Sequence, residues 1–226
     1  MVHVGSVCHQ KRMANFDWLP SLPVLLAYSA AVFLIAITPG PDMALFISRT
    51  LAGGRRAGFA AMFGAVSGLV IHALLAAFGL SALLAASTTA FSIVKIAGAF
   101  YLLWLALGAI RHGSSFNVAV QPQETRPLKR DFLVGLGINL TNPKVVMFFV
   151  TFLPQFVDAG DASASARLLF LGLWFLAIGM PVSAAIIFMA DRFTALMQNS
   201  PRLMRSFDYG FAALMVAFAV RLVLAR

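Results

Sequence analysis

Long runs of apolar residues alternate with short polar segments along almost the whole chain. A helix needs about 20 consecutive, mostly apolar residues to cross the hydrocarbon core of a bilayer. Six segments reach this length, although prolines interrupt the first and the fourth. The six segments are Leu22–Ser48, Phe59–Leu80, Phe91–Ile110, Phe132–Val157, Leu168–Ala190 and Tyr209–Ala225. The pattern therefore predicts an all-α membrane protein with six transmembrane helices.

The composition excludes several other classes of protein. Of the 226 residues, 61% are hydrophobic and only 11% are charged, so the chain has far more apolar surface than one soluble core can bury. Soluble domains carry about 25% charged residues. Cys8 is the single cysteine, which leaves no disulfide within the chain and no cysteine-based metal site.

The basic residues predict how the chain lies across the membrane. The net charge is +9, but the basic residues form short clusters between apolar runs, a pattern that does not indicate nucleic-acid binding. One side of the membrane would receive Arg49, Arg55, Arg56, Arg111, Arg126, Lys129, Arg130, Arg192, Arg202 and Arg205. The other side would receive Lys11, Arg12, Arg167 and Arg226. The excess of positive charge in cytoplasmic loops then puts the first, third and fifth loops in the cytoplasm and both termini in the periplasm.

The six segments divide into two halves of three. The expected order is an N-terminal tail at 1–21 (with Met13 as an alternative start), a first half at 22–110, a cytoplasmic linker at 111–131 and a second half at 132–226. Because each half has an odd number of spans, the second half inserts with the opposite orientation. This predicts a 3+3 inverted repeat.

Each half opens with a helix that proline interrupts. Asp42 follows Pro41 in the first break, and Lys144 follows Pro143 in the second. Transporters built from inverted repeats form their sites at such discontinuous helices near the bilayer midplane. The paired breaks therefore predict a binding site between the halves.

The first break brings polar backbone into an apolar run. Proline has no N–H, so Pro39-Gly40-Pro41 leaves carbonyls without helical donors, which lipid does not tolerate unless protein or a watery cavity covers them. Asp42 lies in the first turn of the new helix, where the dipole favours a carboxylate or another anion. Asp42 is then a ligand for an ammonium group, a proton carrier or both. The simpler alternatives are a kinked helix and a capping acid near the interface.

The second break offers complementary chemistry. Lys144 stands close to Asn139 and Asn142 in the sequence and could bind a carboxylate or pair with Asp42. The alternative is a lysine whose long side chain reaches the membrane interface.

The second segment contributes one titratable residue and a stripe of small ones. His72 suits proton relay, although a lone histidine in an apolar helix is more often a packed residue bonded to a neighbouring backbone. No second histidine or carboxylate accompanies it at ligand spacing, so no metal is predicted. Ala60, Gly64 and Gly68 recur every four residues and predict close helix contact, within the chain or between copies.

Four stretches carry a resemblance to a known family. "ITPGPD", "GRRAGFAAMFGAVSG", "KIAGAFYLLWLALGAIR" and "FLVGLGINLTNPKVVMFFVTFLPQFV" resemble the LysE/RhtB superfamily of amino-acid exporters, in order, from about Leu22 to Ala225. The resemblance implies a bacterial inner-membrane protein with six spans that exports an amino acid or related small metabolite, driven by the proton gradient. The family motif falls on Pro39, Gly40, Pro41, Asp42, Asn142, Pro143 and Lys144. Members often carry Asn at the position of Asp42, which weakens an obligatory proton-carrier role there.

The expected function is export by alternating access coupled to proton antiport, without a cofactor. The partners are the lipid bilayer, a small amino-acid substrate and protons; a homo-oligomer is left open. A passive metabolite channel and a non-transporting membrane scaffold are the alternatives. An enzyme is not expected, because the spans lack a Ser/His/Asp set, a carboxylate pair and a metal cluster. The candidate proton-coupling residues are Asp42 and His72. The candidate substrate-binding residues are Pro39, Gly40, Pro41, Asp42, Asn139, Asn142, Pro143 and Lys144.

Overall fold

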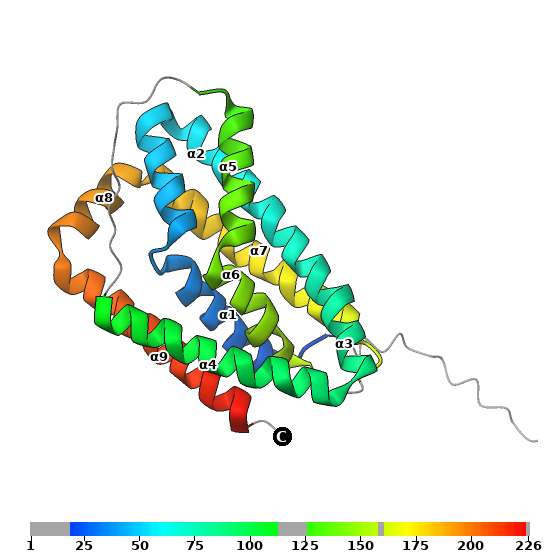
Figure 1. Cartoon of the computed structure of the whole chain (residues 1–226). Helices are drawn as coiled ribbons and strands as arrows, with labels where there is room; N and C mark the ends of the chain where they lie inside the picture. Colours follow the sequence, from blue (N-terminus) through cyan, green and yellow to red (C-terminus); the bar gives the residue numbers. More distant parts are fainter. Residues whose placement is uncertain (1–18, 113–125, 158–160, 225–226) are drawn as a thin grey trace, which may run out of the picture.

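The computed structural model describes residues 19–112, 126–157 and 161–224, and these residues form helices and no strands (Figure 1). The α-helices are α1 (Leu22–Ile37), α2 (Pro41–Leu75), α3 (Ser81–Ala86), α4 (Thr88–His112), α5 (Leu128–Thr141), α6 (Pro143–Met147), α7 (Ala164–Phe188), α8 (Ala190–Asn199) and α9 (Pro201–Leu224). The π-helices η1 (Ala76–Leu80) and η2 (Phe148–Phe152) and the 3-10 helix η3 (Leu153–Phe156) continue α2 and α6. The predicted all-α class is confirmed for the described residues.

Apolar helices of membrane-spanning length are present. Residues Pro41–Leu80 and Ala164–Phe188 are each long and apolar enough to cross a bilayer. A third span results if Leu128–Thr141 and Pro143–Phe156, which meet at a bend of 49°, count as one. These segments support the membrane class; the arrangement of six spans stays a prediction.

Helix α2 reverses its direction at Gly54. This glycine has φ +75°, in the left-handed region that only glycine adopts easily, and it separates two helical stretches. A Cβ atom built on Gly58 would lie 3.3 Å from the carbonyl oxygen of Phe46. Twelve positions of continuous helix would separate these residues by about 18 Å. The two parts of α2 are therefore antiparallel, and in Figure 1 they rise to the top of the molecule and descend from it. The predicted first loop is helical except for this one glycine.

The predicted contact through small residues lies inside the chain. A Cβ atom on Gly64 of α2 would overlap the carbonyl oxygen of Phe132 in α5, and one on Gly135 of α5 would overlap that of Ala61. The backbones of α2 and α5 therefore touch directly, as small residues in membrane helices allow.

An aromatic cluster packs α1 into the main hydrophobic core of the described residues. The fully buried Tyr28 donates a hydrogen bond of 2.8 Å to the carbonyl oxygen of Leu171 in α7. Its ring packs against Phe148, Phe152 and Phe156 at centroid distances of 5.9, 6.0 and 5.2 Å. The cluster joins α1 to α7 and to the segment that follows α6.

Two regions expected as loops contain helical structure. The polar stretch after α7 forms the amphipathic helix α8, and α9 begins directly after the non-helical Ser200, where a loop was expected. The predicted linker at 111–131 overlaps the end of α4 and the start of α5, and 113–125 lies outside the described residues. The tail with Met13 also lies mostly outside them.

Candidate functional site at two helix breaks

The first break leaves carbonyl groups at the end of α1. Helix α1 ends at Ile37 and α2 begins at Pro41. In a continuous helix the N–H of residue 39 would bond the carbonyl oxygen of Ile35, but Pro39 has no N–H. Thr38 is extended, so its carbonyl group also lies outside a helical ladder. Both oxygens need another donor, because lipid provides none.

Lys144 from the second break supplies that donor. Its Nζ donates to the carbonyl oxygens of Ile35 at 3.1 Å and of Thr38 at 2.9 Å. A Cβ atom on Gly40 would lie 3.1 Å from the same Nζ, so the glycine leaves room for the ammonium group beside the backbone. In Figure 1, α1 and α6 accordingly lie together in the middle of the molecule. Two of the three N–H groups of the ammonium are thus used within the protein.

At the second break, the side chain of Asn142 caps the N-terminus of α6. Helix α5 ends at Thr141, and the Oδ1 of Asn142 accepts a bond of 3.0 Å from the backbone N–H of Lys144. Pro143 occupies the first helical position of α6, where a missing N–H costs nothing. Lys144 therefore leaves α6 from a capped first turn and points toward α1.

Asp42 is held from the opposite half of the chain. Asn139, only 1% exposed, donates from Nδ2 to Oδ2 of Asp42 at 2.9 Å. The other carboxylate oxygen, Oδ1, is buried and has no hydrogen-bond partner in the described part of the protein. Among the described residues there is no ion pair within 4.0 Å between Asp42 and Lys144. The two charges therefore do not pair directly, and each bonds to groups from the other break.

A cavity of about 70 Å³ lies between the breaks. It has room for a few water molecules, since one needs at least about 10–15 Å³ of this volume. Its polar lining residues are Thr38, Asp42, Asn139, Lys144 and Ser183. The remaining lining is apolar apart from one glycine, and comes from α1, both parts of α2, α6 and α7.

The predicted candidates fall into three groups. Asp42, Asn139 and Lys144 line the cavity. The backbone breaks at Pro39, Gly40, Pro41, Asn142 and Pro143 position them. His72 does not line the cavity: its ring stacks on Phe149 at a centroid distance of 5.6 Å, and its Nε2 is buried without a hydrogen-bond partner in the described part.

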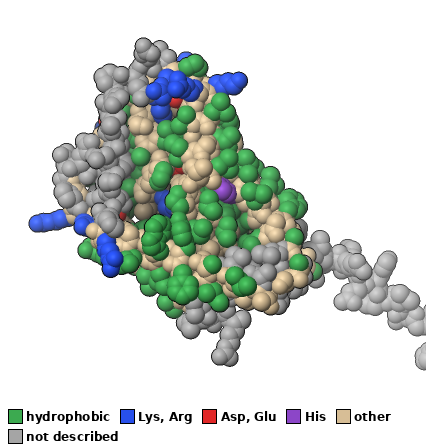
Figure 2. All heavy atoms as spheres, in the orientation of Figure 1, with side chains coloured by type: hydrophobic (Ala, Val, Ile, Leu, Met, Phe, Trp, Pro, Cys, Tyr) green, Lys and Arg blue, Asp and Glu red, His purple; other side chains and the backbone are tan. Residues whose placement is uncertain are grey.

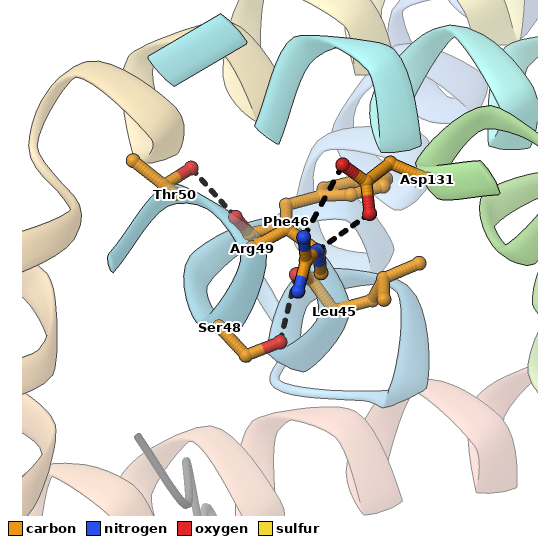
Figure 3. A network of polar contacts seen from close by, with 6 residues as sticks. All are labelled: Leu45, Phe46, Ser48, Arg49, Thr50 and Asp131. Carbon is orange, nitrogen blue, oxygen red and sulfur yellow. Dashed lines mark hydrogen bonds and ion pairs between the residues drawn. The ribbon is translucent and has the colours of Figure 1, made fainter. Parts of the chain in front are cut away.

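One buried ion pair was not predicted from the sequence. The Nε of Arg49, in the first part of α2, lies 2.6 Å from Oδ1 of Asp131 in the first turn of α5, and its Nη2 donates to Oδ2 at 3.3 Å (Figure 3). The sequence predicted that both residues lie in polar loops, yet Arg49 is 6% exposed and Asp131 is 1% exposed. Their separation by 82 positions left no local signal of the pairing.

The described residues contain no group of three or more His, Cys, Asp or Glu side chains that could hold a metal ion. The polar groups of the cavity can instead form hydrogen bonds and ion pairs with a small charged molecule.

Comparison with known proteins gives consistent matches. The LysE type translocator family matches residues 33–226. A homoserine/homoserine lactone efflux protein of Salmonella typhimurium is 30% identical over 212 residues, covering 94% of this chain and 98% of the relative. A leucine efflux protein of Enterobacter sp. is 30% identical over 200 residues, covering 86% and 92%. An uncharacterized membrane protein of Pseudomonas aeruginosa is 29% identical over 204 residues, covering 88% and 94%. No solved structure matches the chain.

Proposed function

The chain belongs to the LysE type translocator family, and from this premise we propose that it exports an amino acid or a related small metabolite across the bacterial inner membrane. The family makes it a membrane translocator and not an enzyme. The cavity between the two helix breaks, lined by Asp42, Asn139 and Lys144, carries the proposal. The efflux of homoserine and of leucine named for two relatives supports an amino acid as cargo.

We further propose six spans arranged as two inverted halves of three. The spans would be α1 with the first part of α2, the second part of α2, α4, α5 with α6, α7, and α9. In such a repeat the first span corresponds to the fourth, and the second to the fifth. A contact between the first and fifth spans should therefore have a counterpart between the fourth and second. Both contacts occur, as α1 against α7 and α2 against α5. The third and sixth spans, α4 and α9, pack against each other, a contact that exchanging the halves leaves unchanged.

The positions of basic residues support an orientation with the turn of α2 and the start of α5 in the cytoplasm. In Figure 2, Lys and Arg side chains gather at the upper and left edges, whereas hydrophobic side chains cover the middle. The exposed basic residues of these regions and of α8 and α9 are Arg55, Arg56, Lys129, Arg130, Arg192, Arg202 and Arg205. Both termini would then lie in the periplasm.

The cavity suits the two ends of a zwitterion. The unpartnered Oδ1 of Asp42 would accept a hydrogen bond from the substrate ammonium group. The remaining N–H of the Lys144 ammonium and the first N–H groups of α2 would hold the carboxylate. Rocking one half against the other would then expose the cavity alternately to the two sides.

Proton antiport is the proposed energy source. A substrate ammonium and a proton would compete for the Asp42 carboxylate, which couples release of one to binding of the other. His72 is the candidate to relay the proton, because the usual pKa of an imidazole lies close to neutral pH. A passive channel would differ by never moving cargo against its gradient.

The test is amino-acid efflux from proteoliposomes, with and without a proton gradient. The wild type should move substrate uphill only with the gradient, and Asp42→Asn and Lys144→Ala should each lose most of this transport. The exposed Arg56→Ala is the control. Full-rate flux that never runs uphill would indicate a channel, and absence of any flux would indicate a scaffold. Unchanged transport in both cavity variants would show that the site lies elsewhere.

A further inference from the structure

One wall of the cavity comes from a single face of α7. Phe175, Gly179 and Ser183 follow each other at intervals of four residues, so they lie on the same side of this helix, and all three line the cavity. Asp42, Asn139 and Lys144 come from the two broken spans instead. The cavity therefore has a charged end at the breaks and a separate side at α7.

The α7 side carries no charge. The lining residues from α7 and from the second part of α2 are Met62, Ala65, Val66, Leu69, Phe175, Gly179, Met180, Ser183 and Ile186. A second charged group on a ligand would lose its hydration here without gaining a counter-charge, which is strongly unfavourable. An uncharged side chain meets no such penalty.

Gly179 provides space on this side. A Cβ atom built there would lie 3.6 and 3.8 Å from the Phe175 ring, an ordinary contact distance. At Gly172 of the same helix, a Cβ atom would come within 2.6 Å of the Ala73 side chain. A larger side chain at 179 therefore reduces the cavity, whereas one at 172 disturbs the contact with α2.

Ser183 provides a hydroxyl group with no bond to the protein in the described residues. A serine within a helix often donates to the carbonyl group four residues earlier, as Ser29 does to Leu25 at 2.7 Å. Ser183 makes no such bond, and the residue is only partly buried. Its hydroxyl is free to bind a polar group in the cavity.

We propose that the site takes α-amino acids with an uncharged side chain, that Gly179 limits the size of this side chain, and that Ser183 binds a hydroxyl group when the side chain carries one. This assignment rests on the proposed export function. The ammonium and carboxylate groups would remain at the helix breaks, and the side chain would point toward α7.

Counterflow of labelled alanine, leucine, homoserine, lysine and glutamate into proteoliposomes tests the assignment. The wild type should transport neutral amino acids at least tenfold faster than lysine or glutamate. Gly179→Val should lower leucine transport at least tenfold and leave alanine transport within twofold. The control is Gly137→Val, on the exposed face of α5 with nothing within 4 Å of its Cβ position. Ser183→Ala should lower the ratio of homoserine to leucine transport several-fold.

The outcomes separate this assignment from the proposed function. Lysine or glutamate transport at the rate of neutral amino acids would overturn the assignment but leave export intact. Equal losses of alanine and leucine transport in a monodisperse Gly179→Val protein would overturn the role of Gly179. An unchanged homoserine-to-leucine ratio in Ser183→Ala would overturn the role of Ser183. Absence of counterflow for all five amino acids would overturn this assignment, and export of another small metabolite would be the remaining form of the proposed function.

Discussion

Arg49 and Asp131 join the first broken span to the start of α5 through a buried ion pair with a closest N–O distance of 2.6 Å and one hydrogen bond. Figure 3 shows the guanidinium group facing the carboxylate, while the neighbouring Ser48 and Thr50 bond to their own helix. Burial makes each charge costly unless the other is present. The two residues belong to different proposed halves, so the pair ties the halves together at the end with the turn of α2.

Removal of one partner should destabilise the protein. Arg49→Leu or Asp131→Leu leaves an uncompensated buried charge, which costs about 3–5 kcal/mol. The double variant Arg49→Leu/Asp131→Leu should recover most of this loss, because apolar replacement of both charges is often close to neutral. Thermal unfolding in detergent measures the coupling as a double-mutant cycle. Additive losses in the cycle would mean that the ion pair contributes no coupling energy.

The direct backbone contact between α2 and α5 leads to a second prediction. Gly135→Ala should destabilise the protein by about 1–3 kcal/mol, because the new methyl group overlaps the Ala61 carbonyl and the helices must separate. Gly137→Ala is the matched control, because it makes the same substitution in the same helix, but its methyl group has no atom within 4 Å. It should be neutral or stabilise α5 by up to about 1 kcal/mol. Thermal unfolding of both variants checks this, and equal behaviour would contradict the close contact.

The sequence predicted the features that depend on local chemistry. Proline removes a helical donor, so breaks were predictable at Pro39, Pro41 and Pro143, and the structure has both. The rule is not absolute, because α7 stays helical through Pro181. The spacing of Gly64 and Gly68 likewise predicted a helix contact, because it depends only on the helical repeat.

Pairings across the chain could not be predicted in this way. The bonds of Lys144 to the carbonyl oxygens of Ile35 and Thr38, more than 100 positions away, were not among the roles expected from the sequence. The same holds for Asp131, whose partner depends on how α2 and α5 pack. At Gly54 the sequence predicted a loop where the structure has helix. The left-handed conformation of this single glycine turns the chain, so both sides of the turn stay helical.

Lys144 supports the fold as well as the proposed site, and the last prediction separates the two roles. Lys144→Met should destabilise the protein by about 1–3 kcal/mol even without substrate, because the Ile35 carbonyl loses its donor. Pro39→Ala restores an N–H and frees Thr38 to continue the helix, so it should recover part of the stability of Lys144→Met. In the wild type it should bring no such gain, since the Ile35 carbonyl already has a donor. Thermal unfolding of the four proteins measures this, and equal effects of Pro39→Ala in both backgrounds would rule the structural role out.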